Sequence, residues 1–290
     1  MGTPIVPDLV LNDGTRMPQL GLGVFQVGDD QARSAVAAAL GCGYRSVDTA
    51  ALYGNERGVG IAVRSSGIPR EQIFVTTKLW NSAHGADGAG PALARSLEKL
   101  GLDQVDLYLI HWPVPSRDLY VETWQAMERV RDEGHARSIG VSNFTIPQLR
   151  RLIAETSTVP AVNQIELHPG FQQQQLRAFH AEHGIVTEAW SPLGQGAALS
   201  EPAVVDLARR HGKTPAQIVL RWHVQLGNVV IPKSVTPARI RENLDVFDVE
   251  LTGEELEAIG ALDRGVRIGP DPELVGVKPA GFSTRIDPSA

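Results

Sequence analysis

The stretch Val105 to Pro113 has the sequence VDLYLIHWP. An apolar run with this many branched side chains predicts a strand buried on both faces, and His111 at its end marks the point where the strand emerges into a site. The stretch Ile73 to Trp80, IFVTTKLW, has the same form and places Lys78 near its end. Runs of this kind indicate the fold, because strands buried on both faces belong to parallel sheets covered by helices.

The alternation of apolar run and amphipathic segment continues in both directions from these strands. Eight strand-helix units follow one another without a Pro/Gly/Ser-rich linker, and this pattern predicts a closed (β/α)8 barrel of the TIM type within the α/β class. We therefore interpret residues 1–290 as a single domain. The units pair LGLGV with 31–40, RSVD with 56–65, IFVTTK with 89–100, VDLYLIH with 119–133, SIGVS with 148–155, AVNQI with 173–183, VTEAW with a longer helical region, and VVIPKS with 237–244.

Two segments lie outside the eight units. Residues 1–19 contain a predicted β-hairpin between Leu9 and Leu20, with Asn12-Asp13-Gly14 as its turn, which we expect to cap the barrel. Thr252 to Leu262 is a further predicted helix, opened by a Thr252 cap with Glu255 three residues later. The tail 263–290 is rich in Gly and Pro, and we expect it to be irregular.

The composition is that of a globular protein, with 42% hydrophobic and 21% charged residues and a net charge of -6. A negative net charge without a Lys/Arg cluster argues against nucleic-acid and anionic-membrane partners. No apolar run approaches the ~18 residues of a membrane helix. The single cysteine, Cys42, cannot form an intramolecular disulfide, so we expect a reducing cytoplasm.

Polar side chains stand at the ends of the predicted strands. Active sites of (β/α)8 barrels lie at the carboxyl ends of the strands, so these side chains should converge on one pocket. They are Asp48, Lys78, His111, Ser142, Asn143, Gln164, Trp190, Ser191, Lys233 and Ser234.

The stretch VDTAALYGNER, 47–57, adds a phenol to this set. Tyr53 is a weak proton donor at neutral pH unless a cation stabilises its anion, and Lys78 within ~4–6 Å would lower its pKa. Asp48 would keep Lys78 charged, and His111 could hydrogen bond to a carbonyl oxygen. Singly, each residue is better explained as structural. Jointly, they indicate carbonyl reduction with Tyr53 as the general acid.

The segment Lys233 to Arg239 suggests the hydride source. Thr236 as N-cap and Pro237 predict a helix start, where anions bind, and the two cations suit the 2′-phosphate of NADPH. An ordinary capped surface helix explains this segment equally well. Trp190 could stack on a nicotinamide, with its carboxamide bound by Ser142, Asn143 and Gln164. GLGVFQ, from Gly21, lacks the third glycine of a Rossmann fingerprint.

The chain resembles the aldo-keto reductases, and within that family the bacterial 2,5-diketo-D-gluconic acid reductase type, over nearly its whole length. The matching stretches are VDTAALYGNE, VTTKLW, VDLYLIHWP, SIGVSNF, AVNQIELHP, WSPLGQG, KTPAQIVLRWH and IPKSVTPARIRENLDVF. The resemblance implies a monomeric, NADPH-dependent reductase of aldehydes and ketones, and it places the family's C-terminal substrate loop within the tail 263–290. It assigns the catalytic roles to Asp48, Tyr53, Lys78 and His111. The nicotinamide carboxamide would be bound by Ser142, Asn143 and Gln164, the nicotinamide ring would stack on Trp190, and the pyrophosphate would lie along Ser191 and Leu193. The adenosine 2′-phosphate and the adenine would be contacted by Lys233, Ser234, Val235, Thr236, Arg239, Glu242 and Asn243.

Aromatic residues are expected to wall the substrate pocket. These are Phe25, Trp80 and Trp112, with Asn81 as a possible polar contact. Indole and phenyl rings bind by area and shape, so the pocket should accept many carbonyl compounds.

Three other classes of protein fit the sequence less well than a carbonyl reductase. A short-chain dehydrogenase needs Tyr-x-x-x-Lys, and no tyrosine in the chain has a lysine four residues later. A metal-dependent barrel hydrolase needs several His and carboxylate ligands, and the pairs Glu166/His168 and His180/His183 are better explained as structural. A non-catalytic NADPH sensor is compatible with the fold alone. We therefore expect no bound metal.

Overall fold

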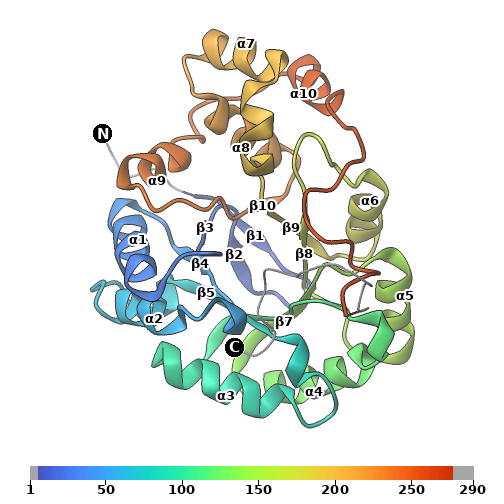
Figure 1. Cartoon of the computed structure of the whole chain (residues 1–290). Helices are drawn as coiled ribbons and strands as arrows, with labels where there is room; N and C mark the ends of the chain where they lie inside the picture. Colours follow the sequence, from blue (N-terminus) through green and yellow to red (C-terminus); the bar gives the residue numbers. More distant parts are fainter. Residues whose placement is uncertain (1–5, 277–290) are drawn as a thin grey trace, which may run out of the picture.

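The computed structural model describes residues 6–276. Eight strands form one parallel sheet whose neighbours follow the order of the sequence (Figure 1). Its two edges join through parallel bridges from Leu20 to Val230 and from Gly23 to Lys233, so the sheet closes into a barrel. This confirms the predicted (β/α)8 fold. The strands are β3 (Leu22–Gly23), β4 (Ser46–Asp48), β5 (Phe74–Leu79), β6 (Val105–Ile110), β7 (Ala136–Ser142), β8 (Val162–Glu166), β9 (Val186–Trp190) and β10 (Val229–Val230).

Helices surround the barrel as an outer layer (Figure 1). The predicted helical region after β9 consists of two helices, α7 and α8. The first ends at Gly212, which has φ +61°, and the second begins with a capping box between Thr214 and Gln217. The helices are α1 (Asp29–Cys42), α2 (Glu56–Arg64), α3 (Ala89–Leu100), α4 (Tyr120–Asp132), α5 (Ile146–Glu155), α6 (Gln174–Glu182), α7 (Pro202–His211), α8 (Pro215–Gln225), α9 (Pro237–Leu244) and α10 (Gly253–Gly260).

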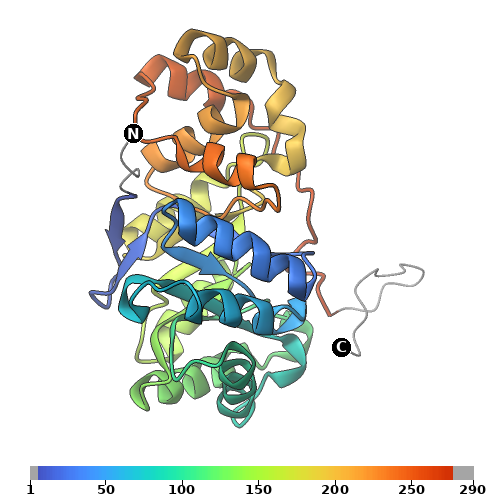
Figure 2. The ribbon, with the colours of Figure 1, turned by 90° about the vertical axis from the view of Figure 1, so that its left-hand side faces the viewer.

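The N-terminal hairpin consists of β1 (Asp8–Val10) and β2 (Arg16–Pro18), which pair antiparallel. Its side chains Leu11 and Met17 are buried in one cluster with Phe74, Leu107 and Val229 from the barrel strands. Figure 2 shows the hairpin on the side of the molecule opposite the C-terminal segment. The hairpin therefore caps the amino end of the barrel, as predicted, and leaves the carboxyl end open.

The chain after the eighth unit runs across that open end. Helix α10 begins with the predicted capping box, in which Thr252 and Glu255 exchange hydrogen bonds. From Arg264 to Gly276 the chain has no helix or strand, and we call this segment the strap. The rest of the predicted C-terminal loop, 277–290, lies outside the described residues. Between residues 6 and 276, no helix combines the length and apolarity needed to cross a membrane.

Candidate active site

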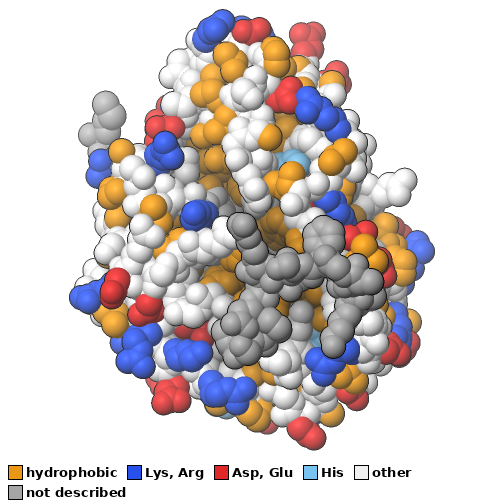
Figure 3. Space-filling model, viewed as in Figure 1, with side chains coloured by type: hydrophobic (Ala, Val, Ile, Leu, Met, Phe, Trp, Pro, Cys, Tyr) orange, Lys and Arg blue, Asp and Glu red, His pale blue; other side chains and the backbone are white. Residues whose placement is uncertain are grey.

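A cleft of about 720 Å³ opens at the carboxyl ends of the strands. The face seen in Figure 3 is hollowed near its centre, and hydrophobic side chains line the hollow. Most residues predicted for the site contribute to this cleft, as expected when strand ends converge. Its lining includes Phe25, Asp48, Tyr53, Trp80, His111, Trp112, Ser142, Asn143, Gln164, Trp190, Ser191, Leu193, Lys233 and Arg239.

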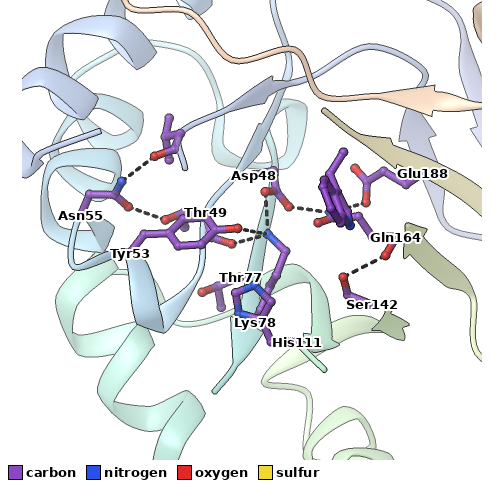
Figure 4. Close-up of polar contacts among 12 residues, drawn as sticks. Asp48, Thr49, Tyr53, Asn55, Thr77, Lys78, His111, Ser142, Gln164 and Glu188 are labelled. Carbon is purple, nitrogen blue, oxygen red and sulfur yellow. Dashed lines mark hydrogen bonds and ion pairs between the residues drawn. The ribbon is translucent and has the colours of Figure 1, made fainter. Parts of the chain in front are cut away.

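An ion pair forms the floor of the cleft. Lys78 on β5 is fully buried, and its Nζ lies 2.6 Å from Oδ1 of Asp48 at the end of β4. The same ammonium donates to the carbonyl oxygen of Thr49 at 3.0 Å and lies 3.4 Å from the hydroxyl of Tyr53 (Figure 4). It also lies 5.0 Å from the centre of the Tyr53 ring. The structure thus brings the phenol and the cation together, although they are 25 residues apart in sequence.

Burial modifies the expected electrostatics of this group. Desolvation raises the pKa of Tyr53 above its ordinary value and outweighs the lowering by the charge of Lys78. The lowering of the Tyr53 pKa by the Lys78 charge is therefore present as predicted, but burial more than offsets it. Desolvation also opposes the charge of Lys78, but Asp48 and the phenol overcome it and raise the lysine pKa. At neutral pH the site holds a protonated phenol beside an ammonium ion.

His111 follows β6 and stands beside the phenol. Its ring centre lies 5.6 Å from that of Tyr53 and 5.3 Å from that of Trp80, both at steep angles. Burial and the charge of Lys78 hold its pKa well below the ordinary value, so the imidazole is neutral near pH 7. Phe25 packs on Tyr53 from the outer side, with ring centres 5.1 Å apart. Phe25 and His111 therefore both pack against the ring of Tyr53 at the cleft.

A hydrogen-bonded chain of side chains crosses from His111 to the opposite wall. Asn143, at φ +66°, donates to the carbonyl oxygen of His111 at 3.0 Å and accepts from the indole N–H of Trp190 at 2.8 Å. The hydroxyl of Ser142 donates to the backbone carbonyl oxygen of Gln164, and the side-chain amide of Gln164 donates to Asp48 at 2.9 Å. These contacts connect the proposed nicotinamide site directly to the ion pair.

The far end of the cleft carries positive charge. Lys233 and Arg239 are exposed, and neither forms an ion pair with any residue from 6 to 276. Two unpaired cations lining one cleft suit a phosphorylated ligand. Helix α9 begins at Pro237 as predicted, but the Thr236 side chain makes no cap; the Thr236 N–H instead donates to Ser234.

Several predicted contacts lie outside the cleft lining. Glu242 accepts a hydrogen bond from Thr214 at 2.8 Å, and Asn243 is buried. Asn81 lies outside the lining, and its carbonyl oxygen accepts from Arg117. The residues in this group are Asn81, Ser234, Val235, Thr236, Glu242 and Asn243. Lys78 also lies outside the lining because it is fully buried beneath the cleft. The roles of all the site residues stay predictions.

Two buried acids belong to the site and were not predicted. Glu188 on β9 accepts a hydrogen bond from Gln164 at 2.8 Å. Glu166, at the end of β8, accepts from the backbone N–H groups of Ile268 and Gly269 at 2.6 and 3.0 Å. Glu188 interrupts the strand VTEAW and Glu166 ends the strand VNQIE, and an acid within a predicted buried strand is a signal that could have identified them.

The strap forms one edge of the cleft through Ile268, Gly269 and Pro270. Glu166 fixes its middle, and Glu273 fixes its far end by accepting from Thr145 and Gln148 at 3.0 and 2.9 Å. The strap also lies against the indole of Trp190, because a Cβ atom on Gly269 would overlap that ring. No local sequence pattern indicated this placement.

Within residues 6–276, no group of three His, Cys, Asp or Glu side chains is placed to hold a metal ion. His168 contacts Glu166, and the ring nitrogens of His180 contact Asn163 and Thr187.

Comparison with known proteins gives one consistent result. The sequence profile of the Aldo/keto reductase family matches residues 19–264. The methylglyoxal reductase DkgA of Escherichia coli K12 is 54% identical over 278 residues, which cover 95% of this chain and all of that protein. A crystal structure of an aldo/keto reductase from Brucella melitensis is 57% identical with a TM-score of 0.87, and covers 89% of this chain and 98% of that one. A crystal structure of a Gox0644 mutant in complex with NADPH is 47% identical with a TM-score of 0.89. The match covers 93% of this chain and 98% of that one.

Proposed function

Because the chain belongs to the aldo/keto reductase family, whose members reduce carbonyl groups, we propose that it reduces aldehydes and ketones to alcohols with NADPH. The substrates proposed are small compounds with adjacent or repeated carbonyl groups, such as methylglyoxal and 2,5-diketo-D-gluconate. The observation that carries the proposal is the contact of the Lys78 ammonium with both Asp48 and the hydroxyl of Tyr53 at the cleft floor. The similarity to a methylglyoxal reductase supports the substrate class.

The residues of the cleft fit NADPH. Lys233 and Arg239 supply unpaired positive charge for the 2′-phosphate, and Ser191 and Leu193 line the same cleft. Trp190 is half-buried and fixed through its indole N–H by Asn143, so its ring is available for stacking. Ser142, Asn143 and Gln164 supply polar groups for the carboxamide. When bound, NADPH supplies the hydride that reduces the carbonyl carbon.

The protein's own residues supply the proton. Tyr53 is protonated at neutral pH, so its hydroxyl can give the proton to the carbonyl oxygen of the substrate as that oxygen gains negative charge. Lys78 stabilises the phenolate that remains, and Asp48 holds Lys78 in place. The neutral imidazole of His111 orients the same oxygen by a hydrogen bond without competing as an acid. A proton from water then restores Tyr53.

The proposal is tested by following the consumption of NADPH with a panel of aldehydes and dicarbonyls. Tyr53→Phe should lower kcat by about 10²–10⁴, the usual contribution of a general acid, while the Kd for NADPH changes little. Tyr108→Phe is the matched control, because that phenol is also buried but lies outside the cleft. Unchanged turnover in Tyr53→Phe would remove Tyr53 from the mechanism. Binding of NADPH by the wild type without turnover of any substrate would indicate a sensor.

The substrate class is tested within the same panel. Methylglyoxal and 2,5-diketo-D-gluconate should give higher kcat/KM than bulky aromatic ketones, because the strap and the rings of Phe25, Trp80 and Trp112 narrow the cleft. A preference for the aromatic ketones would contradict the proposed class and leave the carbonyl chemistry intact.

A further inference from the structure

Glu188 lies in the centre of the catalytic network although its sequence surroundings are apolar. It is 1% exposed and stands in the middle of β9, in register with Gln164 on β8 and Val229 on β10. The amide nitrogen of Gln164 donates to Glu188 Oε2 at 2.8 Å and to Asp48 Oδ2 at 2.9 Å (Figure 4). One amide group therefore bridges two carboxyl groups.

The two carboxyl groups are not equivalent. Asp48 is paired with Lys78 at 2.6 Å, whereas Glu188 makes no ion pair within residues 6–276, and its Oε1 is buried there without a hydrogen-bond partner. A buried, uncompensated carboxylate is costly, so the acid without a cation should carry the proton. Burial and the negative charge of Asp48 raise the pKa of Glu188 to about 8, which agrees with this assignment.

The charged and titratable groups that act on Glu188 are few. Asp48 on β4 and Lys78 on β5 face it across the barrel, and it acts in turn on Tyr53 in the turn after β4. Its strand partners Gln164 and Val229 carry no charge. The protonation of Glu188 is therefore coupled to the catalytic ion pair and to the phenol.

The amide of Gln164 has one allowed orientation in this arrangement. An ionised Asp48 can only accept hydrogen bonds, so the amide nitrogen must face it, and the second N–H is taken by Glu188. With both N–H groups used, the side-chain oxygen Oε1 of Gln164 is the atom left for a ligand in the cleft, which Gln164 lines. We propose that Glu188 is a positioning residue that acts as a neutral carboxylic acid, holding Gln164 toward the nicotinamide carboxamide and keeping a second negative charge away from Tyr53.

The role of Glu188 rests on the proposed function, and it predicts how the rate of carbonyl reduction depends on pH. If Glu188 ionised, the Gln164 amide would lie between two carboxylates, those of Glu188 and Asp48. The negative charge of Glu188 would also raise the pKa of Tyr53 and so weaken that phenol as a proton donor. Carbonyl reduction should therefore decline as the pH passes about 8, the pKa of Glu188. A decline caused by ionisation of Tyr53 itself would lie at higher pH, because its pKa is raised above 10.0.

The protonation state is tested first on the protein without cofactor. Infrared difference spectra between neutral and alkaline pH should show loss of the C=O band of a protonated carboxylic acid in the wild type. Glu188→Gln should lack this difference. A wild-type spectrum that matches that of Glu188→Gln would overturn the assignment, whether or not the protein reduces carbonyls.

The positioning role is tested by the pH profile of kcat/KM for wild type, Glu188→Gln and Glu188→Leu. The wild type should show a midpoint near pH 8 that is absent from Glu188→Gln. Glu188→Leu removes the acceptor and should raise the Kd for NADPH roughly 2–10-fold, while Glu188→Gln keeps an acceptor and should stay below that range. Glu56→Gln is the matched control, since Glu56 is buried and accepts from Thr77 outside the cleft.

The outcomes separate the two proposals. An unchanged midpoint near pH 8 in Glu188→Gln, or its loss in Glu56→Gln as well, would overturn the role of Glu188 while the carbonyl reductase proposal stands. Absence of wild-type turnover across the substrate panel would overturn the proposed function, and the infrared test would still decide the protonation of Glu188. If Glu188→Leu does not fold, Glu188→Gln and the infrared spectra carry the test.

Discussion

Replacing Lys78 by methionine should have two separable effects, one on stability and one on catalysis. The ammonium is fully buried and lies 2.6 Å from Asp48. Removing it leaves the aspartate charge buried without a cation, and breaking a buried pair in this way costs about 3–5 kcal/mol. Chemical denaturation followed by circular dichroism measures this loss.

The catalytic effect follows from the distance to the phenol. At 3.4 Å and with an effective dielectric constant of about 20, the attraction between an ammonium and a phenolate is at most about 5 kcal/mol. Each ~1.4 kcal/mol is a factor of ten in rate, so losing most of this energy in Lys78→Met should lower kcat by about 10²–10³. The double variant Asp48→Asn/Lys78→Met separates the effects, because it removes both charges.

We expect the double variant to recover most of the lost stability and none of the lost rate. If Lys78→Met unfolded with the same free energy as the wild type, an unpaired buried Asp48 would cost nothing, which contradicts the expected loss. A double variant that regains activity would show that the lysine acts only by neutralising Asp48 and not on Tyr53.

Three further predictions follow from the geometry. Burial holds the pKa of His84 at about 4 and those of His180 and His223 at about 3. The folded state therefore favours the neutral imidazoles, and their contribution to the free energy of unfolding is complete above pH 6.5 and is lost as the pH falls. Each histidine should lower that free energy by about 1.4 kcal/mol per pH unit between about pH 6 and 4. Denaturation at several pH values should show a shallower loss in His180→Gln; an identical slope would contradict this. Gly269→Ala should displace the strap from Trp190 and raise the KM for substrate several-fold, whereas Gly28→Ala, with nothing within 4 Å of the new Cβ, should not. Arg239→Ala should weaken NADPH binding by about 1–2 kcal/mol and leave NADH binding unchanged, and an equal loss for both dinucleotides would place the 2′-phosphate elsewhere.

The order of elements was predictable from the sequence because it depends on local patterns. Apolar runs such as 105–110 read as buried strands, and Thr252 with Glu255 marked a helix start that the structure reproduces. The prediction gave one long helical region where the structure has the two helices α7 and α8, although Gly212 and Thr214 mark the break between them. The positions of Asp48, Lys78 and His111 at strand ends were predictable for the same reason, since parallel strands place their carboxyl ends on one face.

The barrel and the rim on which the polar residues gather could be predicted from local patterns, because both depend on periodicity within a few residues. The protonation of Tyr53 and Glu188 follows from the folded protein, because desolvation depends on everything packed around a group and not on its neighbours in the chain. The same holds for the strap, which reaches Glu166 across 102 residues. Such contacts are fixed by how the finished barrel brings distant segments together.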